Sequence, residues 1–179
     1  MVTLDGFFEG PHKWEIDWHT VGEEFNELAI DFLKSADALI FGGVTYQGMA
    51  AYWSSDEAVK DDPIVAGLMN SLPKIVFSRT LEKADWNNTR QVKSDAVREI
   101  TRLKAQPGKD LLIFGSANLA SSLIQNGLVD EYRIFINPII LGQGTPLFKG
   151  IKDRLPLKLV DSKIFKNGLV LLVYLPAKS

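Results

Sequence analysis

The sequence contains no cysteine, and this absence excludes several classes of chemistry at once. Disulfide bridges, cysteine nucleophiles, iron–sulfur clusters and thiolate zinc sites all require that residue. Any catalytic chemistry must therefore come from other side chains or from a bound cofactor.

Long apolar runs and long basic runs are also missing. No stretch approaches the roughly 18 apolar residues of a membrane span, and the opening MVTLDGFFEG lacks the basic and apolar parts of a secretory signal. The formal net charge is −2, whereas phosphate backbones are bound by clustered Lys and Arg. We expect a cytoplasmic protein that binds small molecules and neither nucleic acid nor membrane.

The chain is long enough for one hydrophobic core and too short for two. It has 179 residues, whereas single cores tend to split beyond roughly 250 residues. Hydrophobic residues make up 46% and charged residues 23%, as in ordinary globular proteins. We therefore predict a single domain over residues 1–179. The stretch Tyr52 to Asp62 shows no core pattern and is predicted to be a loop.

The first two thirds of the chain alternate between strand and helix patterns. Apolar residues recur at helical spacing from Phe25 to Leu33. Short continuous apolar runs, typical of strands buried on both faces, occupy 38–41, 74–77 and 111–114. Helical patterns cover 96–104 and 117–125. This alternation predicts an α/β fold with a parallel sheet.

The last third contains strand patterns only, at 132–136, 157–165 and 169–175. The last two flank Asn167-Gly168, a strong hairpin signal. Near the start, Val2 to Leu4 is predicted to be the end of a strand, because Asp5-Gly6 signals a turn. The prediction is a mixed, mostly parallel central sheet with a C-terminal antiparallel hairpin at one edge.

Three strand ends lead into Gly-, Ser- or Thr-containing turns. In α/β sheets, ligands bind at the carboxyl ends of strands, where free amides at helix starts meet phosphates. Together the three junctions predict a nucleotide site, although each alone is equally well explained as a helix cap. The junctions are Gly42-Gly43-Val44-Thr45, Ser78-Arg79-Thr80 and Gly115-Ser116-Ala117-Asn118.

Familiar phosphate and metal motifs are absent. Gly43 and Gly48 have P-loop spacing, but Met49 and Ala50 stand where Lys and Ser/Thr are required, and no G-x-G-x-x-G follows the first buried strand. His12 and His19 have no third ligand nearby in sequence, so we expect no metal site. Arg79 is placed to meet a 2′-phosphate, with a solvated turn arginine as the alternative.

Five segments in order resemble the dihydrofolate-reductase-like family that includes the C-terminal reductase domain of the bifunctional riboflavin-biosynthesis proteins (RibD). They are TLDG, FGGVTY, IVFSRTL, IFGSANLASSLIQNGLVDEY and PIILGQGTPLF. The resemblance implies a three-layer fold with helices on both faces of the sheet, and a homodimer. An exposed apolar edge at Leu169-Val170-Leu171-Leu172-Val173 would favour such a dimer.

The resemblance also implies NADPH as the cofactor. Gly42, Gly43, Val44 and Thr45 with Gly115, Ser116, Ala117 and Asn118 would then hold the pyrophosphate and nicotinamide side. Ser78 and Arg79 would hold the 2′-phosphate. The zinc deaminase partner of the bifunctional proteins needs a P-C-x-x-C signature, which a chain without cysteine lacks.

The substrate side departs from the folate reductases. Their first-helix carboxylate aligns with Asn26, which together with Ile30 lies at the edge of the apolar helix face. Asp5 is the candidate catalytic group facing the nicotinamide, with a turn-capping carboxylate as the equal alternative. Trp18 is the candidate ring over the substrate.

Two functions remain open at this point. The first is an NADPH-dependent reductase of a pteridine or (ribosylamino)pyrimidine-like substrate, related to 5-amino-6-(5-phosphoribosylamino)uracil reductase. The alternative is a catalytically silent nucleotide-binding or dimeric interaction module, which the missing acid at Asn26 motivates.

Overall fold

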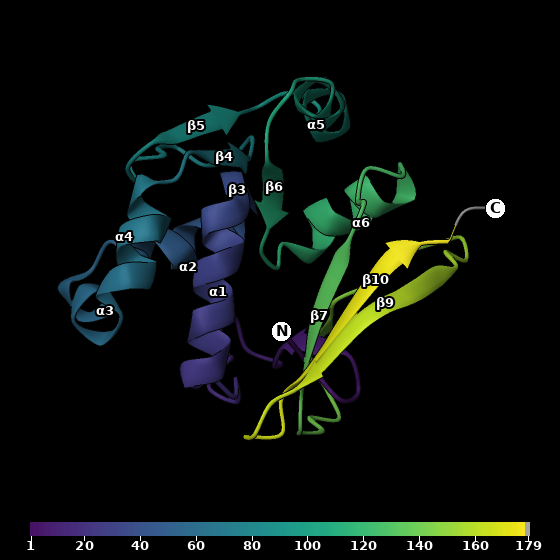
Figure 1. Cartoon of the computed structure of the whole chain (residues 1–179). Coiled ribbons are helices and arrows are strands. Elements are labelled where there is room, and N and C mark those ends of the chain that lie inside the picture. The colour runs from purple at the N-terminus through teal and green to yellow at the C-terminus, as the bar shows by residue number, and fades with distance from the viewer. Residues whose placement is uncertain (178–179) are drawn as a thin grey trace. The chain divides into compact units, whose positions relative to one another are not determined.

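The computed structural model describes residues 1–177 (Figure 1), and the chain divides into two compact units. One comprises Met1–Gly22 and the chain from Ser121 onward, and the other comprises Glu23–Ala120. We call the first the outer unit, because its two segments flank the other unit in the sequence, and we call the second the inner unit. The expectation that residues 1–179 form one domain stays a prediction.

The inner unit is built around a four-stranded, fully parallel sheet with the order β5-β4-β3-β6. Its strands are β3 (Ala36–Gly42), β4 (Lys74–Phe77), β5 (Thr89–Val92) and β6 (Asp110–Ile113). Its helices are α1 (Glu23–Ser35), α2 (Gly43–Trp53), α3 (Asp56–Asp61), α4 (Pro63–Ser71) and α5 (Ala96–Lys104), while α6 (Ala117–Gln125) begins here and ends in the outer unit.

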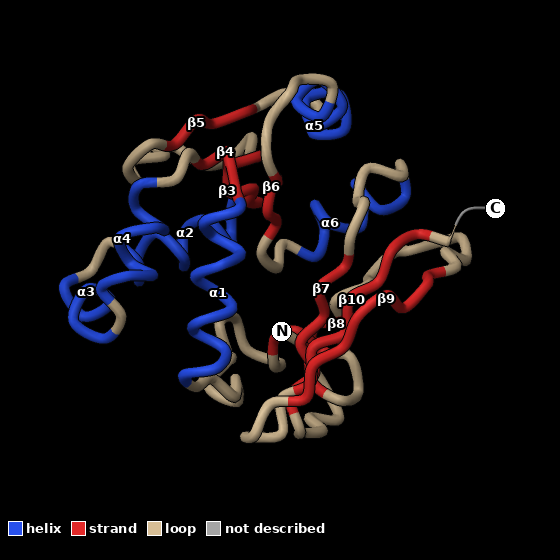
Figure 2. Tube along the Cα trace, in the orientation of Figure 1, coloured by secondary structure: helices blue, strands red, loops and turns tan. Residues whose placement is uncertain are grey.

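Three aromatic rings form the centre of the inner core, where α1, α2 and α4 lie beside β3 and β4 (Figure 2). The Phe41 ring lies 6.4 Å from that of Tyr46 and 5.9 Å from that of Trp86, centroid to centroid. The Tyr46 hydroxyl accepts a hydrogen bond of 2.9 Å from the Trp86 backbone N–H. Because Tyr46 is on α2, this contact ties that helix to the loop between β4 and β5.

The predicted loop over Tyr52 to Asp62 is wrong, since α2 continues to Trp53 and α3 follows. Ser55 caps α3 by accepting from the Ala58 N–H at 3.2 Å, and Asp62 caps α4 by accepting from the Val65 N–H at 2.9 Å. A helix of six residues is too short to show an apolar period. In the sequence, only its capping residues indicate where such a helix begins.

The outer unit contains a mixed sheet with the order β1-β7-β10-β9 and a small sheet of β2 and β8. Its strands are β1 (Val2–Thr3), β2 (Phe7–Glu9), β7 (Tyr132–Asn137), β8 (Thr145–Pro146), β9 (Leu157–Ile164) and β10 (Val170–Pro176). The predicted hairpin is confirmed: Phe165 N–H donates to Leu169 O at 2.9 Å, and Gly168 has a φ of 88°.

The expectation that Leu169 to Val173 forms an exposed apolar edge is wrong. The strand β10 lies between β7 and β9, so both of its edges are paired. Leu169 and Leu171 are 0% and 4% exposed. The edge strands of this sheet are β1 and β9, and β9 presents Val160 and Ile164 to solvent.

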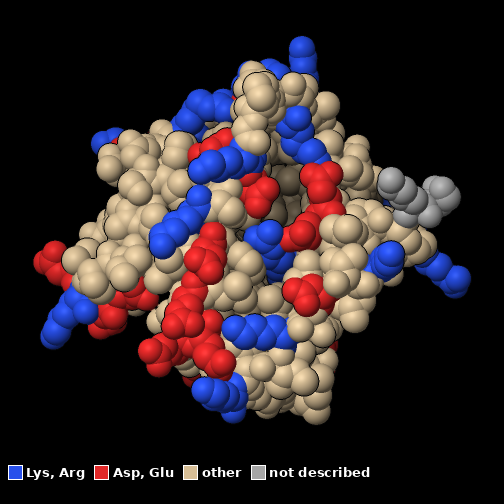
Figure 3. Space-filling view, viewed as in Figure 1, with Lys and Arg blue, Asp and Glu red and all other residues tan. Residues whose placement is uncertain are grey.

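The predicted α/β class is confirmed, with parallel strands in the inner unit and antiparallel strands in the outer one. The hydrogen bonds assign the C-terminal hairpin to a different sheet from β3, β4 and β6. Within residues 1–177, no helix has the length and apolar character to cross a membrane. Figure 3 shows acidic and basic side chains interspersed on the face in view.

The Tyr46 hydroxyl should contribute measurably to stability. Tyr46→Phe leaves the Trp86 N–H, a buried donor, without its acceptor, and we expect a loss of about 1–3 kcal/mol in the free energy of unfolding. Urea denaturation measures this. Tyr52→Phe, at an exposed tyrosine, is the matched control and should change stability by less than about 0.5 kcal/mol. Equal effects of the two substitutions would contradict the account.

Candidate functional site

The three predicted junctions begin at one edge of the inner sheet. β3 pairs in parallel with β4, with Gly42 opposite Phe77, and with β6, with Ile40 opposite Ile113. Strands paired in this direction have their carboxyl ends at the same edge. Residues 42–45, 78–79 and 115–118 follow these ends directly.

The first and second junctions approach closely at Gly43 and Ser78. A Cβ added to Gly43 would lie 2.7 Å from Ser78 Oγ and 3.0 Å from Ser78 Cβ. That hydroxyl is held in place, since it accepts hydrogen bonds from the N–H groups of Thr80 at 3.3 Å and Leu81 at 3.0 Å. Space alone therefore requires glycine at position 43.

The first and third junctions are joined by a hydrogen bond. Gly42 N–H donates to Ser116 Oγ at 2.9 Å. A Cβ added to Gly115 would lie 3.8 Å from Thr45 Cγ2, so these two turns are also in contact distance. The structure thus brings together all three junctions that the sequence indicated.

The third junction places a left-handed turn directly before a helix. Gly115 and Ser116 both adopt the left-handed conformation, with φ values of 55° and 54°, and α6 begins at the next residue. The first amides of a helix have no partner within the helix and can meet an anion. Left-handed backbone is unfavourable for serine. The hydrogen bond from Gly42 N–H to the Ser116 hydroxyl helps to hold Ser116 in this conformation.

The first junction supplies a second set of amides. The residue that caps α2 is Gly42, which has no side chain to accept hydrogen bonds from the first turn. The N–H groups of that turn therefore remain available to a phosphate. Val44 in this turn is 57% exposed, whereas Tyr46 is buried and anchors the helix.

Arg79 is an unpaired cation at the end of β4. Its side chain is exposed and forms no hydrogen bond or ion pair with any residue in the range 1–177. The turn beneath it is fixed by Gln91, whose amide donates to Ser78 O at 3.1 Å and Leu81 O at 2.8 Å. A guanidinium in this position is available for a phosphate ligand.

Sequence reasoning missed a second cation, Lys93, at the same edge. β5 pairs in parallel with β4, with Val92 opposite Phe77, and Ser78 N–H donates to Val92 O at 3.2 Å. Lys93 therefore follows a strand end directly beside Ser78 and Arg79. The signal was weak because TRQV, the sequence of β5, has too few apolar residues to stand out.

Asp5 lies in the outer unit, where its carboxylate holds a turn. Oδ1 accepts from the Thr3 hydroxyl at 2.6 Å and from Leu141 N–H at 3.3 Å, while Oδ2 accepts from Gly142 N–H at 2.8 Å. The bond from Thr3, with those from the two amides, lowers the pKa of Asp5 below its ordinary value. Asp5 is therefore ionised at neutral pH and acts as an acceptor; its catalytic role stays a prediction.

Trp18 also lies in the outer unit, in a loop that is internally hydrogen-bonded. Its indole N–H donates to Glu15 O at 3.0 Å, and its ring meets that of His19 edge-on at 4.5 Å. Burial lowers the pKa of His19 to about 4, so that ring is neutral. The loop ends at Thr20, whose N–H donates to the buried Asn137 Oδ1 at 2.7 Å.

Asn26 and Ile30 lie on α1 in the inner unit, and both are half-buried. Ile30 packs against the core that contains Phe41 and Tyr46. Asp5 and Trp18 belong to the other unit, so the structure groups the predicted cofactor residues with Asn26 and Ile30 only. Among residues 1–177, no group of three or more His, Asp or Glu side chains is placed to hold a metal ion.

Comparison with known proteins shows the family of the chain. The family model of the RibD C-terminal domain matches residues 1–171. The chain belongs to the RibD C-terminal domain family. The uncharacterized protein YyaP of Bacillus subtilis (strain 168) is 36% identical to this family member over 173 residues, which cover 97% of this chain and 90% of YyaP.

Solved structures support the same assignment for this RibD C-terminal domain. A putative riboflavin biosynthesis protein from Shewanella sp. PV-4 is 25% identical, with a TM-score of 0.76 over 99% of this chain and 96% of that one. Dihydrofolate reductase from Enterococcus faecalis, solved with NADP(H), gives a TM-score of 0.65 at 14% identity over 99% and 93% of the chains, which shows the fold. The predicted dihydrofolate-reductase-like fold and family are confirmed.

The close approach of Gly43 to Ser78 predicts opposite outcomes for two helix glycines. Gly43→Ala forces a methyl group against the fixed Ser78 hydroxyl and should lower the free energy of unfolding by about 1–3 kcal/mol. Gly67→Ala, in α4 with open space around its Cβ, should raise it by about 0.5–1 kcal/mol. Guanidinium denaturation of both variants checks this, and a stabilised Gly43→Ala protein would contradict the geometry.

Proposed function

We propose that this chain is an NADPH-dependent reductase of a pteridine or (ribosylamino)pyrimidine-like substrate, related to 5-amino-6-(5-phosphoribosylamino)uracil reductase of riboflavin biosynthesis. The observation that carries the proposal is the meeting of the three junctions in the inner unit. Together they offer two sets of helix-start amides, a left-handed turn at residues 115–116 and an unpaired arginine. The proposal keeps the cytoplasmic location expected from the sequence.

The residues present fit a phosphorylated dinucleotide. The amides of residues 43–45 and of 115–118 would hold the pyrophosphate and nicotinamide side, because they point partial positive charge at one edge. Ser78 and Arg79 would hold the 2′-phosphate, with Lys93 as a second cation. When bound, the cofactor supplies the hydride, and the protein binds and orients it.

The substrate-side roles in this proposal are assigned to each residue separately. Asp5 would orient the reacting groups as a hydrogen-bond acceptor, since its ionised carboxylate has no proton to donate. Trp18 would stack on an aromatic ring. Asn26 would offer its amide, and Ile30 an apolar surface, to a substrate bound beside α1. A proton needed by the product would then come from solvent.

Two observations favour a second candidate, a catalytically silent nucleotide-binding or dimeric interaction module. Asn26 stands where folate reducers have an acid, and Asp5 is already occupied by three hydrogen bonds. Steady-state oxidation of NADPH with a panel of pterins and aminopyrimidines separates the two functions. Turnover with any of them supports the reductase, whereas tight cofactor binding without turnover supports the silent module.

Cofactor selectivity should depend mainly on Arg79. Hydrogen bonds to charged groups contribute roughly 1.5–3 kcal/mol, and every ~1.4 kcal/mol is tenfold in affinity. Arg79→Ala should therefore weaken NADPH binding by at least about tenfold and leave NADH binding nearly unchanged. Lys93→Ala should produce a smaller loss of the same kind, since a lysine is a point charge without a fork.

Titration of NADPH and NADH into the wild type and each variant measures this selectivity. Lys60→Ala, which removes an exposed cation at the end of α3, is the matched control and should change neither affinity. An equal loss of both cofactors in Arg79→Ala would show that Arg79 does not contact the 2′-phosphate.

Dihydrofolate should be a poor substrate. Reduction of a dihydropterin needs a proton as well as the hydride, and the Asn26 amide has no titratable proton to give in place of a carboxylic acid. The proton would have to come from solvent without a positioned donor, which slows the reaction. We expect little or no dihydrofolate-dependent oxidation of NADPH, with a small gain in Asn26→Asp. Absorbance at the NADPH band follows the reaction, and efficient turnover by the wild type would overturn the expectation.

We also propose that the protein is a homodimer. In the described chain the second edge of β9 is unpaired, and Leu159, Val160 and Ile164 are 49%, 46% and 80% exposed. Such an edge favours association with a second copy. Light scattering at micromolar concentration should give twice the 19.9 kDa chain mass. Val160→Lys should lower the measured mass toward that of one chain. A monomeric wild type would refute the dimer.

A further inference from the structure

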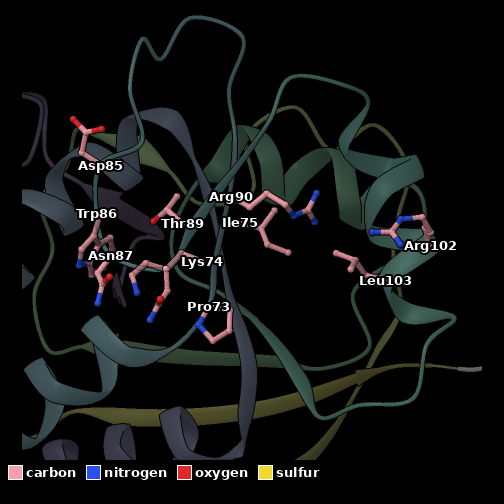
Figure 4. A pocket seen from close by; sticks show the side chains of 11 residues that line it. Pro73, Lys74, Ile75, Asp85, Trp86, Asn87, Thr89, Arg90, Arg102 and Leu103 are labelled. Atoms are coloured by element: carbon pink, nitrogen blue, oxygen red, sulfur yellow. The ribbon is translucent and has the colours of Figure 1, made fainter.

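The inner unit has a hollow at the amino edge of its sheet, opposite to the edge with the three junctions. It has a volume of about 800 Å³ and lies where β4 and β5 begin (Figure 4). Ligand sites in proteins typically have volumes of ~300–1,000 Å³, apolar walls and a few polar groups. The lining residues are Pro73, Lys74, Ile75, Asp85, Trp86, Asn87, Asn88, Thr89, Arg90, Arg102 and Leu103.

Two arginines on one side of the hollow are held by a single carboxylate. Arg90 donates to Glu99 Oε1 at 2.6 Å, and Arg102 donates to Oε2 at 3.0 Å and Oε1 at 2.9 Å. Glu99 is 14% exposed, whereas the arginine side chains are 50% and 55% exposed. One carboxylate balances one of the two positive charges, so the arginine pair keeps a net charge of about one.

The ion pair also fixes the arginines in position. The bonds from Arg102, and then those from Arg90, lower the pKa of Glu99 to about 2, so the carboxylate stays ionised at any ordinary pH. The ion pair therefore fixes the orientation of the remaining guanidinium N–H groups before any ligand binds. Side chains that are already fixed lose less conformational entropy on binding than mobile ones.

The other walls of the hollow carry one exposed carboxylate, that of Asp85, and one buried ammonium group, that of Lys74. Lys74 is 1% exposed, donates to Asn70 O at 3.2 Å and Leu72 O at 2.6 Å, and lies 4.5 Å from the Trp86 ring centre. Burial lowers the pKa of Lys74 to about 8. The Lys74 ammonium group is therefore hydrogen-bonded inside the protein. The positive charge that a ligand can reach is that of the arginine pair.

We propose that this hollow is a second ligand site, which binds a small organic acid by its carboxylate on Arg90 and Arg102. Figure 4 shows the Arg90 side chain extending in the direction of Arg102, with Ile75 and Leu103 beside them. A carboxylate matches the guanidinium fork, and its single negative charge matches the single uncompensated positive charge. The apolar body of the acid would lie against Pro73 and Leu103. This site does not rest on the proposed reductase function.

The test uses 4-phenylbutyrate as the probe and 4-phenylbutan-1-ol as its uncharged counterpart. Each is titrated into the ¹⁵N-labelled full chain while backbone amide shifts are recorded. We expect saturable shifts at residues 87–90 and at Leu103, with an affinity in the millimolar range or tighter and at least about tenfold better than that of the alcohol.

Arg102→Ala should weaken phenylbutyrate binding by at least about tenfold. Arg98→Ala is the matched control, because Arg98 is exposed on the same helix but does not line the hollow, and it should bind as the wild type does. Arg102→Gln, which keeps part of the aliphatic stem and a polar end without the charge, replaces the alanine variant if that variant does not fold. Shifts that do not saturate at these residues, or equal losses in the Arg102 and Arg98 variants, would overturn the proposal.

Discussion

The parallel pairing of β3 with β4 on one side and with β6 on the other is the constraint on which the meeting of the three junctions depends. It places Gly42, Phe77 and Ile113 at neighbouring strand ends, so that three separate turns meet. Two short-range contacts then fix the turns: Ser78 against Gly43, and the bond from Gly42 to Ser116. Without the shared direction of the strands, none of these contacts would form.

The sequence predicted much of this edge because its information is local. The apolar runs at 38–41, 74–77 and 111–114 became β3, β4 and β6, each within two residues of the predicted ends. Gly, Ser and Thr after each run identified the turns. Parallel strands then bring their ends together without any knowledge of side-chain contacts. Five motifs in order added the family, which the comparisons confirmed.

The remainder depends on contacts between residues far apart in the sequence. Lys93 is a candidate phosphate ligand only because β5 pairs with β4. The polar sequence of β5 does not indicate a strand. The donors around Asp5 come from Thr3 and from a turn more than 130 residues away, at 141–142. The central place of β10 in its sheet likewise depends on its pairing with both β7 and β9. Local periodicity carries no information on such partners.

We propose that the three junctions form one site for a phosphorylated nicotinamide dinucleotide. Titration of the ¹⁵N-labelled chain with NADP⁺, followed by backbone amide shifts, tests this proposal without any need for a substrate. We expect residues 43–45, 78–79 and 115–118 to shift together and to saturate at one common dissociation constant. Saturable shifts confined to other parts of the chain, or no saturation at these three turns, would contradict it.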